Sequence, residues 1–426
     1  MDIVQRHLAA RVERALGTSR VVNIVGPRQA GKTTLVRNLI ETAFYATLDD
    51  DAVRSALEAD AYGQLHLLSD QAKSSGRPIV LDEVQRVPEI TFALKRIVDA
   101  DRRPGQFVLT GSSDIFTTGA AYDSLAGRVL TLTLRPFSAA EIAGAGPCGL
   151  LDAVSSHPAD CLDVLPKPCS FTRRQAIDLI VRGGFPEIRA LPDPDRMDRY
   201  RSYLDSIVER DVAPVAHVRK PDMLRRLIDQ MAARTAEEIN VAALCQVLGA
   251  RKETVNDYID ILSRLGIVHR LGAWTSSGAK REIKAPKLHF LDTGCATALR
   301  GEDSGSFGLG ADPTALGHLL ETFVFTELEK SLAFLSKRWR LYHWRLDSRE
   351  IDIVAEAPGK LLALFEMKAA STVDVQDFRH IDWFRSEGPG RDYHAAGFVI
   401  YLGSQLLSFG PGRIAVPLSM LWSFEK

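Results

Sequence analysis

The chain has 426 residues, of which 46% are hydrophobic and 25% are charged, and its formal net charge is −1. This composition is typical of a globular chain with about two to four domains. The near-zero net charge excludes a bulk electrostatic attraction to nucleic acid, so any such contact must come from a local basic patch.

The sequence carries no signal for export or membrane insertion. Residues 1–7 lack the apolar core of a signal peptide, and no apolar run approaches the length of a transmembrane helix. The cysteines are odd in number and lack CxxC spacing, which disfavours a metal cluster; they are Cys148, Cys161, Cys169, Cys245 and Cys295. We therefore expect a cytoplasmic protein with free thiols and no membrane contact.

Residues 26–34 match the phosphate loop of nucleotide hydrolases, with the sequence Gly26, Pro27, Arg28, Gln29, Ala30, Gly31, Lys32, Thr33 and Thr34. The apolar run before the loop predicts a strand, and the apolar positions after it are spaced as in a helix. In this setting the loop backbone would bind phosphates, Lys32 would reach the β- and γ-phosphates, and the Thr33 hydroxyl would bind Mg²⁺. The alternative is an ordinary glycine turn in a βα unit.

The apolar run at residues 77–81 predicts a second strand, which ends in Asp82 and Glu83. Asp82 would hold Mg²⁺ through water, and Glu83 would polarise the attacking water. The alternative is a strand end with solvated acids, which the phosphate loop upstream disfavours.

A third strand is predicted at residues 106–109 and runs into Thr110, Gly111, Ser112 and Ser113. Ser112 or Ser113 would contact the γ-phosphate, because ligands bind at the carboxyl ends of strands in open α/β sheets. A helix N-cap role is an equally open and compatible interpretation.

Two arginines are candidates for sensing the γ-phosphate. Arg128 lies on a glycine-containing turn before a predicted strand and would act within its own subunit or from a neighbour. A structural salt bridge is the alternative for Arg128, and Arg210 is a weaker second candidate.

Residues 1 to about 215 resemble the AAA-type (AAA+ or STAND-like) P-loop ATPases of bacteria and archaea whose C-terminal region was long an uncharacterised domain. The segments that carry the resemblance are 26–29, 48–50, 81–85, 109–113, 125–128 and 183–187. The resemblance implies ATP and Mg²⁺ as cofactors, and a homo-oligomer, with a hexameric ring as one form, because such sites are often completed by a neighbour's arginine.

The segment 183–187 resembles the Gly-x-Pro lid motif of related switch ATPases, which implies that Pro186 packs near the adenine. The stretch 144–170 departs from the family pattern. It is rich in Gly, Pro, Ser and Cys and predicts a loop or insertion of unknown role.

Residues 236–273 predict a helix-turn-helix followed by a strand, which is a winged-helix pattern. The second helix leaves Arg251 and Lys252 off its apolar face, and a basic stretch with Lys280, Arg281, Lys284 and Lys287 follows. These residues would contact DNA phosphates. The alternative is a winged helix that packs between domains or binds protein.

The C-terminal third contains a second possible site. Residues 350–354 and 361–368 predict a hairpin whose alternation places Glu366 and Lys368 on one face, with Asp352 near the same end. Glu321 falls on the apolar stripe of a helix predicted from Leu316 to Leu332.

Glu321, Asp352, Glu366 and Lys368 resemble the active site of PD-(D/E)XK nucleases, in which carboxylates hold Mg²⁺ and the lysine orients water or stabilises charge. The alternatives are a structural ion-pair cluster, or a fold that holds DNA without cleaving it.

The sequence therefore predicts an α/β protein with a P-loop AAA-type parallel sheet core (1–145), a loop or insertion (146–170), a helical lid (171–235), a winged helix-turn-helix (236–292) and a restriction-endonuclease-like α/β domain (310–426). The expected function is a Mg²⁺-dependent ATPase that binds and remodels DNA, with or without cleavage. The alternative is a nucleotide-controlled switch that binds a protein partner in defence or toxin control.

Overall fold

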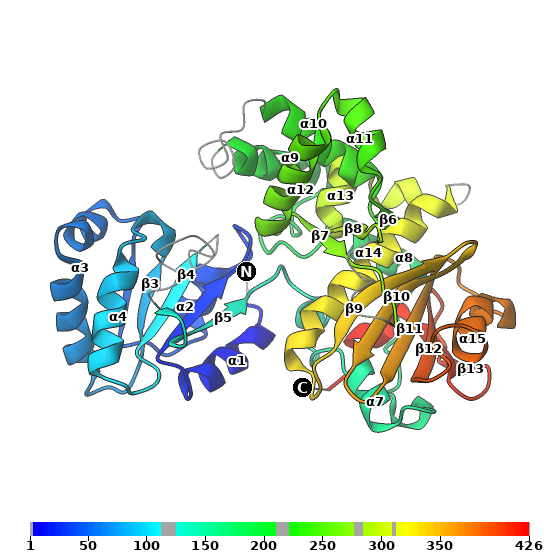
Figure 1. The fold of residues 1–426 in the computed structure, drawn as a ribbon, viewed down its shortest axis with the longest axis horizontal. Coiled ribbons are helices and arrows are strands. Elements are labelled where there is room, and N and C mark those ends of the chain that lie inside the picture. Colours follow the sequence, from blue (N-terminus) through cyan, green and yellow to red (C-terminus); the bar gives the residue numbers. More distant parts are fainter. Residues whose placement is uncertain (1–2, 112–124, 210–220, 277–283, 309–311, 426) are drawn as a thin grey trace. The chain divides into compact units, whose positions relative to one another are not determined.

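The computed structural model describes residues 3–111, 125–209, 221–276, 284–308 and 312–425. The chain forms two compact units, Met1–Phe137 and Ser138–Lys426, which Figure 1 draws in sequence colours. Ser138 opens the second unit as the N-cap of a helix: its side chain accepts from the Glu141 N–H, and the Glu141 side chain accepts from the Ser138 N–H. The first unit therefore ends a few residues before the boundary predicted at residue 145.

Within the described residues, the first unit contains a five-stranded sheet in the order β2-β3-β4-β1-β5, and every pairing is parallel. The strands are β1 (Val21–Val25), β2 (Phe44–Thr47), β3 (Ile79–Asp82), β4 (Phe107–Gly111) and β5 (Val129–Thr133). The helices are α1 (His7–Leu16), α2 (Lys32–Asn38), α3 (Asp51–Ala72) and α4 (Ile90–Ala100), with a 3-10 turn η1 (Val84–Arg86). The strands predicted before the phosphate loop, at residues 77–81 and at residues 106–109 are confirmed as β1, β3 and β4.

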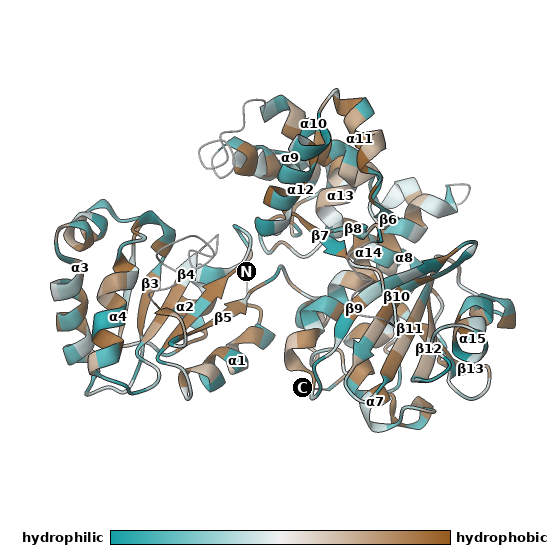
Figure 2. Ribbon diagram, in the orientation of Figure 1, coloured by the Kyte–Doolittle hydropathy of each residue, from teal (hydrophilic) through white to brown (hydrophobic). Residues whose placement is uncertain are grey.

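Helices cover both faces of this sheet, as the ribbon in Figure 1 shows. Strand residues alternate between two cores: Val21 packs with residues of α3 and α4, whereas Val22 and Ile24 pack with residues of α1 and α2. Both faces are apolar, which explains why the strands appear largely hydrophobic in Figure 2. A sheet buried on both sides needs strands of this kind.

The second unit contains most of the helices. They are α6 (Ala139–Ala143), α7 (Leu150–Ser156), α8 (Arg173–Arg182), α9 (Asp193–Ile207), α10 (Pro221–Ala233), α11 (Val241–Leu248), α12 (Lys252–Arg264), α13 (Thr293–Arg300), α14 (Pro313–Ser331) and α15 (Arg379–Ser386). The 3-10 turns are η3 (Leu162–Val164), η6 (Ser304–Phe307), η7 (Leu332–Phe334), η8 (Val375–Phe378) and η9 (Leu418–Trp422).

In the described part of this unit the strands form two sheets, ordered β13-β14-β12-β11-β10-β9 and β6-β8-β7. Their bounds are β6 (Glu237–Glu238), β7 (Val268–Leu271), β8 (Lys287–Phe290), β9 (Arg340–Leu346), β10 (Arg349–Ala357), β11 (Leu361–Lys368), β12 (His394–Tyr401), β13 (Leu407–Ser408) and β14 (Arg413–Pro417). The predicted hairpin is present as the antiparallel pair β10 and β11, with Ile353 opposite Phe365.

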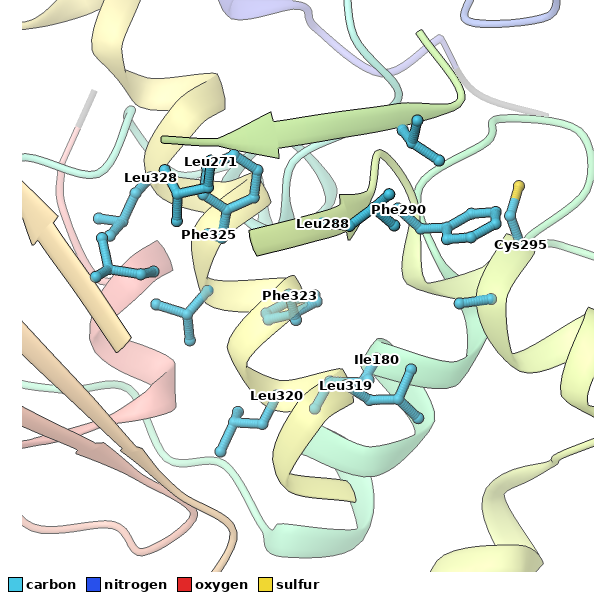
Figure 3. Packing of buried hydrophobic residues seen from close by; sticks show 14 of the residues in the cluster. Ile180, Leu271, Leu288, Phe290, Cys295, Leu319, Leu320, Phe323, Phe325 and Leu328 are labelled. Carbon is cyan, nitrogen blue, oxygen red and sulfur yellow. The ribbon is translucent and has the colours of Figure 1, made fainter. Parts of the chain in front are cut away.

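One hydrophobic core, which runs from Ala139 to Trp422, joins the segments that the sequence assigned to three separate domains. Helix α14 lies at its centre: Figure 3 shows Leu319, Phe323 and Phe325 among residues of α8, β7, β8 and α13. Because the lid, helix-turn-helix and C-terminal segments share this core, they form one compact unit.

The stretch 146–170, predicted as a loop or insertion, contains α7 and η3. Leu150, Leu151 and Val154 of α7 are buried in the shared core, as are Cys148 and Cys161. All five cysteines are free thiols. None of the helices in the described part of the chain is both long and apolar enough to cross a membrane.

Truncating Phe325 tests the shared core. Phe325 is fully buried and stacks on His289 with 4.5 Å between ring centroids, so Phe325→Ala should cost about 3–5 kcal/mol. Tryptophan fluorescence in a urea titration will follow this unit alone, because all five tryptophans lie in it: Trp274, Trp339, Trp344, Trp383 and Trp422.

The matched control is Leu346→Ala. Leu346 is 42% exposed, so its truncation should cost about 0.5 kcal/mol or less, the usual scale of surface substitutions. An equal effect of the two variants would contradict the central position of α14.

Candidate functional site

The phosphate loop connects β1 to α2 in backbone conformations that favour glycine. Gly26 has φ 153° and Gly31 has φ 95°. A Cβ on Gly26 would lie 2.0 Å from the Leu134 carbonyl oxygen, so no side chain fits there. Gln29 also has a positive φ, of 61°. These conformations turn the loop around the amino end of α2, where a helix dipole favours an anion.

Lys32 is held inside the loop. Its side chain is buried, and Nζ donates to the carbonyl oxygens of Gly26 and Pro27 at 2.9 Å each. The ammonium therefore satisfies two loop carbonyls from within the turn. A phosphate group entering the loop would offer the same ammonium a stronger, charged acceptor.

Asp82 is the centre of a hydrogen-bonded group at the carboxyl edge of the sheet. Its Oδ2 accepts from Thr33 Oγ1 at 2.8 Å and from the Tyr45 hydroxyl at 2.7 Å, and its Oδ1 accepts from the Thr110 hydroxyl. Burial, with the hydrogen bond to Asp82, raises the pKa of Tyr45 well above its usual range, so the phenol stays protonated and donates.

The pair Thr33 and Asp82 fits Mg²⁺, which binds oxygen ligands and usually combines one or two protein oxygens with phosphate and water. Glu83 follows in a left-handed conformation with φ 60°, and its carboxylate accepts from Gln85 Nε2. The backbone N–H of Glu83 donates to Thr110 Oγ1 at 3.4 Å. Thr110 thus bonds to the Asp82 carboxylate and to the Glu83 backbone.

Sheet order explains this convergence. Strand β4 lies between β1 and β3, with Ile24 opposite Thr110 and Leu81 opposite Leu109. Thr110 is therefore the polar residue between the phosphate loop and the two acids. The sequence analysis proposed Ser112 or Ser113 for this position instead. Those two serines, like Arg210, lie outside the described residues.

The prediction that Arg128 senses the γ-phosphate within its own subunit is wrong. Arg128 precedes β5 at the amino edge of the sheet, and its guanidinium pairs with Asp99 at 2.6 and 2.9 Å. The phosphate loop follows β1 at the opposite edge, roughly 13 Å away for a five-residue strand. The salt bridge, the alternative interpretation, holds Arg128 in place.

The segment with Pro186 belongs to the second unit. Gly184 N–H donates to Asp292 Oδ2 at 2.7 Å, and the Tyr200 hydroxyl donates to Asp292 Oδ1 at 3.1 Å. Phe185 is buried against Tyr200 and Tyr203. In this structure the motif therefore fastens α8 to α9 and α13, and the adenine contact of Pro186 stays a prediction.

The predicted DNA-binding residues differ in their exposure and contacts. Arg251 and Lys252 are exposed at the start of α12. Lys284 is exposed, and its Nζ donates to the Arg345 carbonyl oxygen at 3.1 Å. Lys280 and Arg281 lie outside the described residues.

The assignment of Lys287 to a DNA-contacting wing is wrong, because its side chain is only 3% exposed. Nζ lies 2.8 Å from Glu321, 2.5 Å from Glu350 and 3.5 Å from Asp352. Burial opposes the charged form, but these carboxylates raise the pKa of Lys287 above its usual range. The lysine is therefore a buried cation among acids.

The predicted nuclease carboxylates gather around this lysine. Burial, reinforced by neighbouring acids, raises the pKa of Glu321 and of Glu366 well above the usual value. Asp352 accepts from the Met367 N–H at 2.9 Å. His289 is fully buried beside them, with Nε2 3.8 Å from Glu321, and burial lowers its pKa well below the usual value.

Lys368, predicted to act with these acids, has a different partner in the structure. Lys368 is 45% exposed and pairs with Asp377. In the described part of the chain, no group of three or more His, Cys, Asp or Glu side chains is placed to hold a metal ion. The ammonium of Lys287 lies where a divalent cation would balance the carboxylates, so these residues do not fit Mg²⁺ as arranged.

A cavity of about 1030 Å³ opens beside the cluster in the second unit. Its lining includes Lys287, Glu350, Glu238, Arg345 and Lys252. The sequence analysis did not assign Glu350 to the group of acids around Lys287. A usable signal was the strand Lys287-Leu288-His289-Phe290, in which alternation predicts that a lysine and a histidine share one face.

Neutralising Lys287 tests the internal cation. Lys287→Met should destabilise the second unit by about 3–5 kcal/mol, because it leaves buried carboxylates unpaired. The raised pKa values of Glu321 and Glu366 favour folding when these groups are protonated and oppose it as pH rises. The free energy of unfolding that Lys287→Met removes should therefore be smaller at about pH 5 than at about pH 8. Urea titration with tryptophan fluorescence measures it.

Lys284→Met, at an exposed position three residues away, is the control and should be nearly neutral. A loss for Lys287→Met that does not change with pH would contradict the unpaired-acid explanation.

Comparison with known proteins assigns the first unit. The family described as "AAA domain" matches residues 18–143. Families described as "Domain of unknown function (DUF8612)" and "Domain of unknown function (DUF4143)" match residues 173–306 and 316–421. A Walker-type ATPase of Pyrococcus abyssi is similar at 13% identity and a TM-score of 0.42, over 70% of this chain and 96% of that one.

Two uncharacterized proteins, from Mycobacterium tuberculosis and Mycobacterium bovis, are each 31% identical over 379 residues, which is 88% of this chain and 76% of theirs. The chain therefore belongs to the same family as these mycobacterial proteins, and its first unit is an AAA-type P-loop ATPase domain.

Proposed function

We propose that the protein is a Mg²⁺-dependent ATPase. The observation that carries the proposal is the convergence of Lys32, Thr33, Asp82 and Thr110 at one edge of the sheet of an AAA domain. In this proposal, the loop backbone and Lys32 bind the phosphates.

Each acid has a separate task in the proposed reaction. Thr33 and Asp82 would hold Mg²⁺, and a metal ion there would supply positive charge against the phosphates. Glu83 would orient and polarise the attacking water, and Thr110, which bonds to the Asp82 carboxylate and to the Glu83 backbone N–H, would hold the two strand-end residues in place. The Arg128 guanidinium pairs with Asp99. An arginine that completes the site would therefore come from a neighbouring subunit of a homo-oligomer.

We propose that the second unit is a nuclease-like binding module without cleavage activity. Support comes from Lys287, which occupies the centre of the acid cluster, and from Lys368, which pairs with Asp377 instead. DNA is the candidate ligand that one observation favours: Arg251 and Lys252 lie exposed together at the start of α12. A protein partner is the alternative.

Two substitutions test the ATPase. Lys32→Ala should reduce phosphate release to background, because it removes the loop's cation. Glu83→Gln should keep ATP binding but slow hydrolysis by about 10²–10⁴-fold, the usual contribution of a general base. Lys73→Ala, at an exposed residue paired with Asp70, is the control, and wild-type turnover by Lys32→Ala would remove the ATPase assignment.

A double charge reversal tests DNA binding. Arg251→Glu with Lys252→Glu should weaken duplex binding and flatten its salt dependence, by about one unit of slope for each phosphate that the variant no longer neutralises. Fluorescence anisotropy over a salt series measures both quantities. The exposed pair Lys337→Glu and Arg338→Glu keeps the net charge equal, and the same weakening in both variants would reject α12 as the DNA-binding element.

The DNA incubations also test cleavage. The wild-type protein with Mg²⁺ or Mn²⁺ should leave single-stranded, duplex and branched DNA intact. Metal-dependent cleavage that Asp352→Ala abolishes would show the acid cluster to be catalytic and would contradict the proposed module.

A further inference from the structure

A buried arginine at the entrance to the first helix contacts the phosphate loop. Arg6 immediately precedes α1 and is 7% exposed. Its Nη1 donates to the Ala30 carbonyl oxygen at 2.8 Å, inside the loop. Neither the resemblance of the phosphate-loop motifs nor the proposed roles of Lys32, Asp82 and Glu83 account for this hydrogen bond.

The hydrogen bond to Ala30 orients a peptide of the loop backbone that would bind an anion. In a trans peptide the carbonyl and the following N–H point in opposite directions. Because Arg6 holds the Ala30 oxygen on its own side, the N–H of Gly31 is directed to the other side of the loop. A charged donor makes such a bond stronger than a neutral one would.

The same guanidinium has a second attachment. Its Nη2 donates to the Arg135 carbonyl oxygen at 2.6 Å, and Cζ lies over the Phe137 ring at 4.8 Å from the centroid. Arg135 and Phe137 belong to the segment that follows β5 and ends the first unit. Arg6 thus ties the phosphate loop to the exit segment, residues 134–137.

The exit segment also touches the loop directly. Leu134 N–H donates to the Val25 carbonyl oxygen at 2.8 Å, and the Leu134 oxygen lies against Gly26 so closely that a Cβ there would be 2.0 Å away. Both ends of the loop are therefore attached to one short segment, through Leu134 at Gly26 and through Arg6 at Ala30.

We propose that Arg6 is a positioning residue for phosphate binding, and that it couples occupancy of the loop to the exit segment 134–137. The inference rests on the proposed nucleotide-binding function of the loop. Arginine is required because its planar fork donates from two nitrogens to two fixed acceptors at once, whereas the ammonium of lysine acts as a point charge.

The first test compares Arg6→Lys with the wild type by calorimetric titration with Mg²⁺–ATP and Mg²⁺–ADP in the full-length protein. Losing one charged hydrogen bond in the loop should weaken nucleotide affinity by about 10- to 100-fold. The effect should fall on KM more than on kcat, because Arg6 does not touch the reacting atoms. Arg14→Lys, at an exposed position on the same helix, should match the wild type.

The second test is hydrogen exchange of the 132–138 peptide with and without Mg²⁺–ADP. In the wild type, nucleotide should slow exchange both in the loop peptide and at Leu134, whose N–H bonds to Val25. In Arg6→Lys at saturating nucleotide, the loop peptide should still be protected while the protection gained at 132–138 should be lost.

The outcomes separate the two proposals. A wild type that binds no nucleotide would overturn the proposed function itself. A wild type that binds, together with Arg6→Lys of unchanged affinity and unchanged protection at 132–138, would overturn only the role of Arg6. If Arg6→Lys does not fold, Phe137→Leu keeps the guanidinium but removes the ring beneath it and should weaken the same coupling; normal coupling in that variant would also overturn the inference.

Discussion

A parallel sheet brings the carboxyl ends of its strands to one edge, and the nucleotide site depends on this constraint. Strand β4 separates the phosphate-loop strand β1 from the acid-bearing strand β3. Thr110 at the end of β4 therefore reaches both Asp82 and Glu83. The site is a consequence of strand order, since the three strands are far apart in the sequence and share no local motif.

The polar groups at this edge already have protein partners. Lys32 bonds two loop carbonyls, and Asp82 accepts from Thr33, Tyr45 and Thr110. A buried polar group without a partner would be costly, so these hydrogen bonds stabilise the loop. Under the proposed function, a phosphate oxygen, a metal ion or water would replace some of these protein partners when the nucleotide binds.

Local patterns predicted the elements of this protein well, because strand alternation and helical spacing depend on neighbours in the sequence. The phosphate-loop strand, the acid-bearing strand and the β10–β11 hairpin lie where the sequence places them. The errors arise where a partner comes from elsewhere in the chain. Arg128 is paired by Asp99 of α4, and Lys287 by acids of α14 and β10. A basic residue in a basic stretch gives no local sign of which distant carboxylates surround it.

The two units therefore balance clustered acids in opposite ways. Around Asp82 the neighbours are hydroxyls of Thr33, Tyr45 and Thr110, which carry no charge, so the carboxylate can still attract a cation from solution. Around Glu321 and Glu350 the balancing cation is Lys287, which is covalently part of the chain and cannot dissociate. Coulomb attraction is strong at such short separations away from water, so a divalent ion would have to displace a tethered ammonium. The first arrangement suits a site that cycles through ligands, whereas the second suits a fixed scaffold.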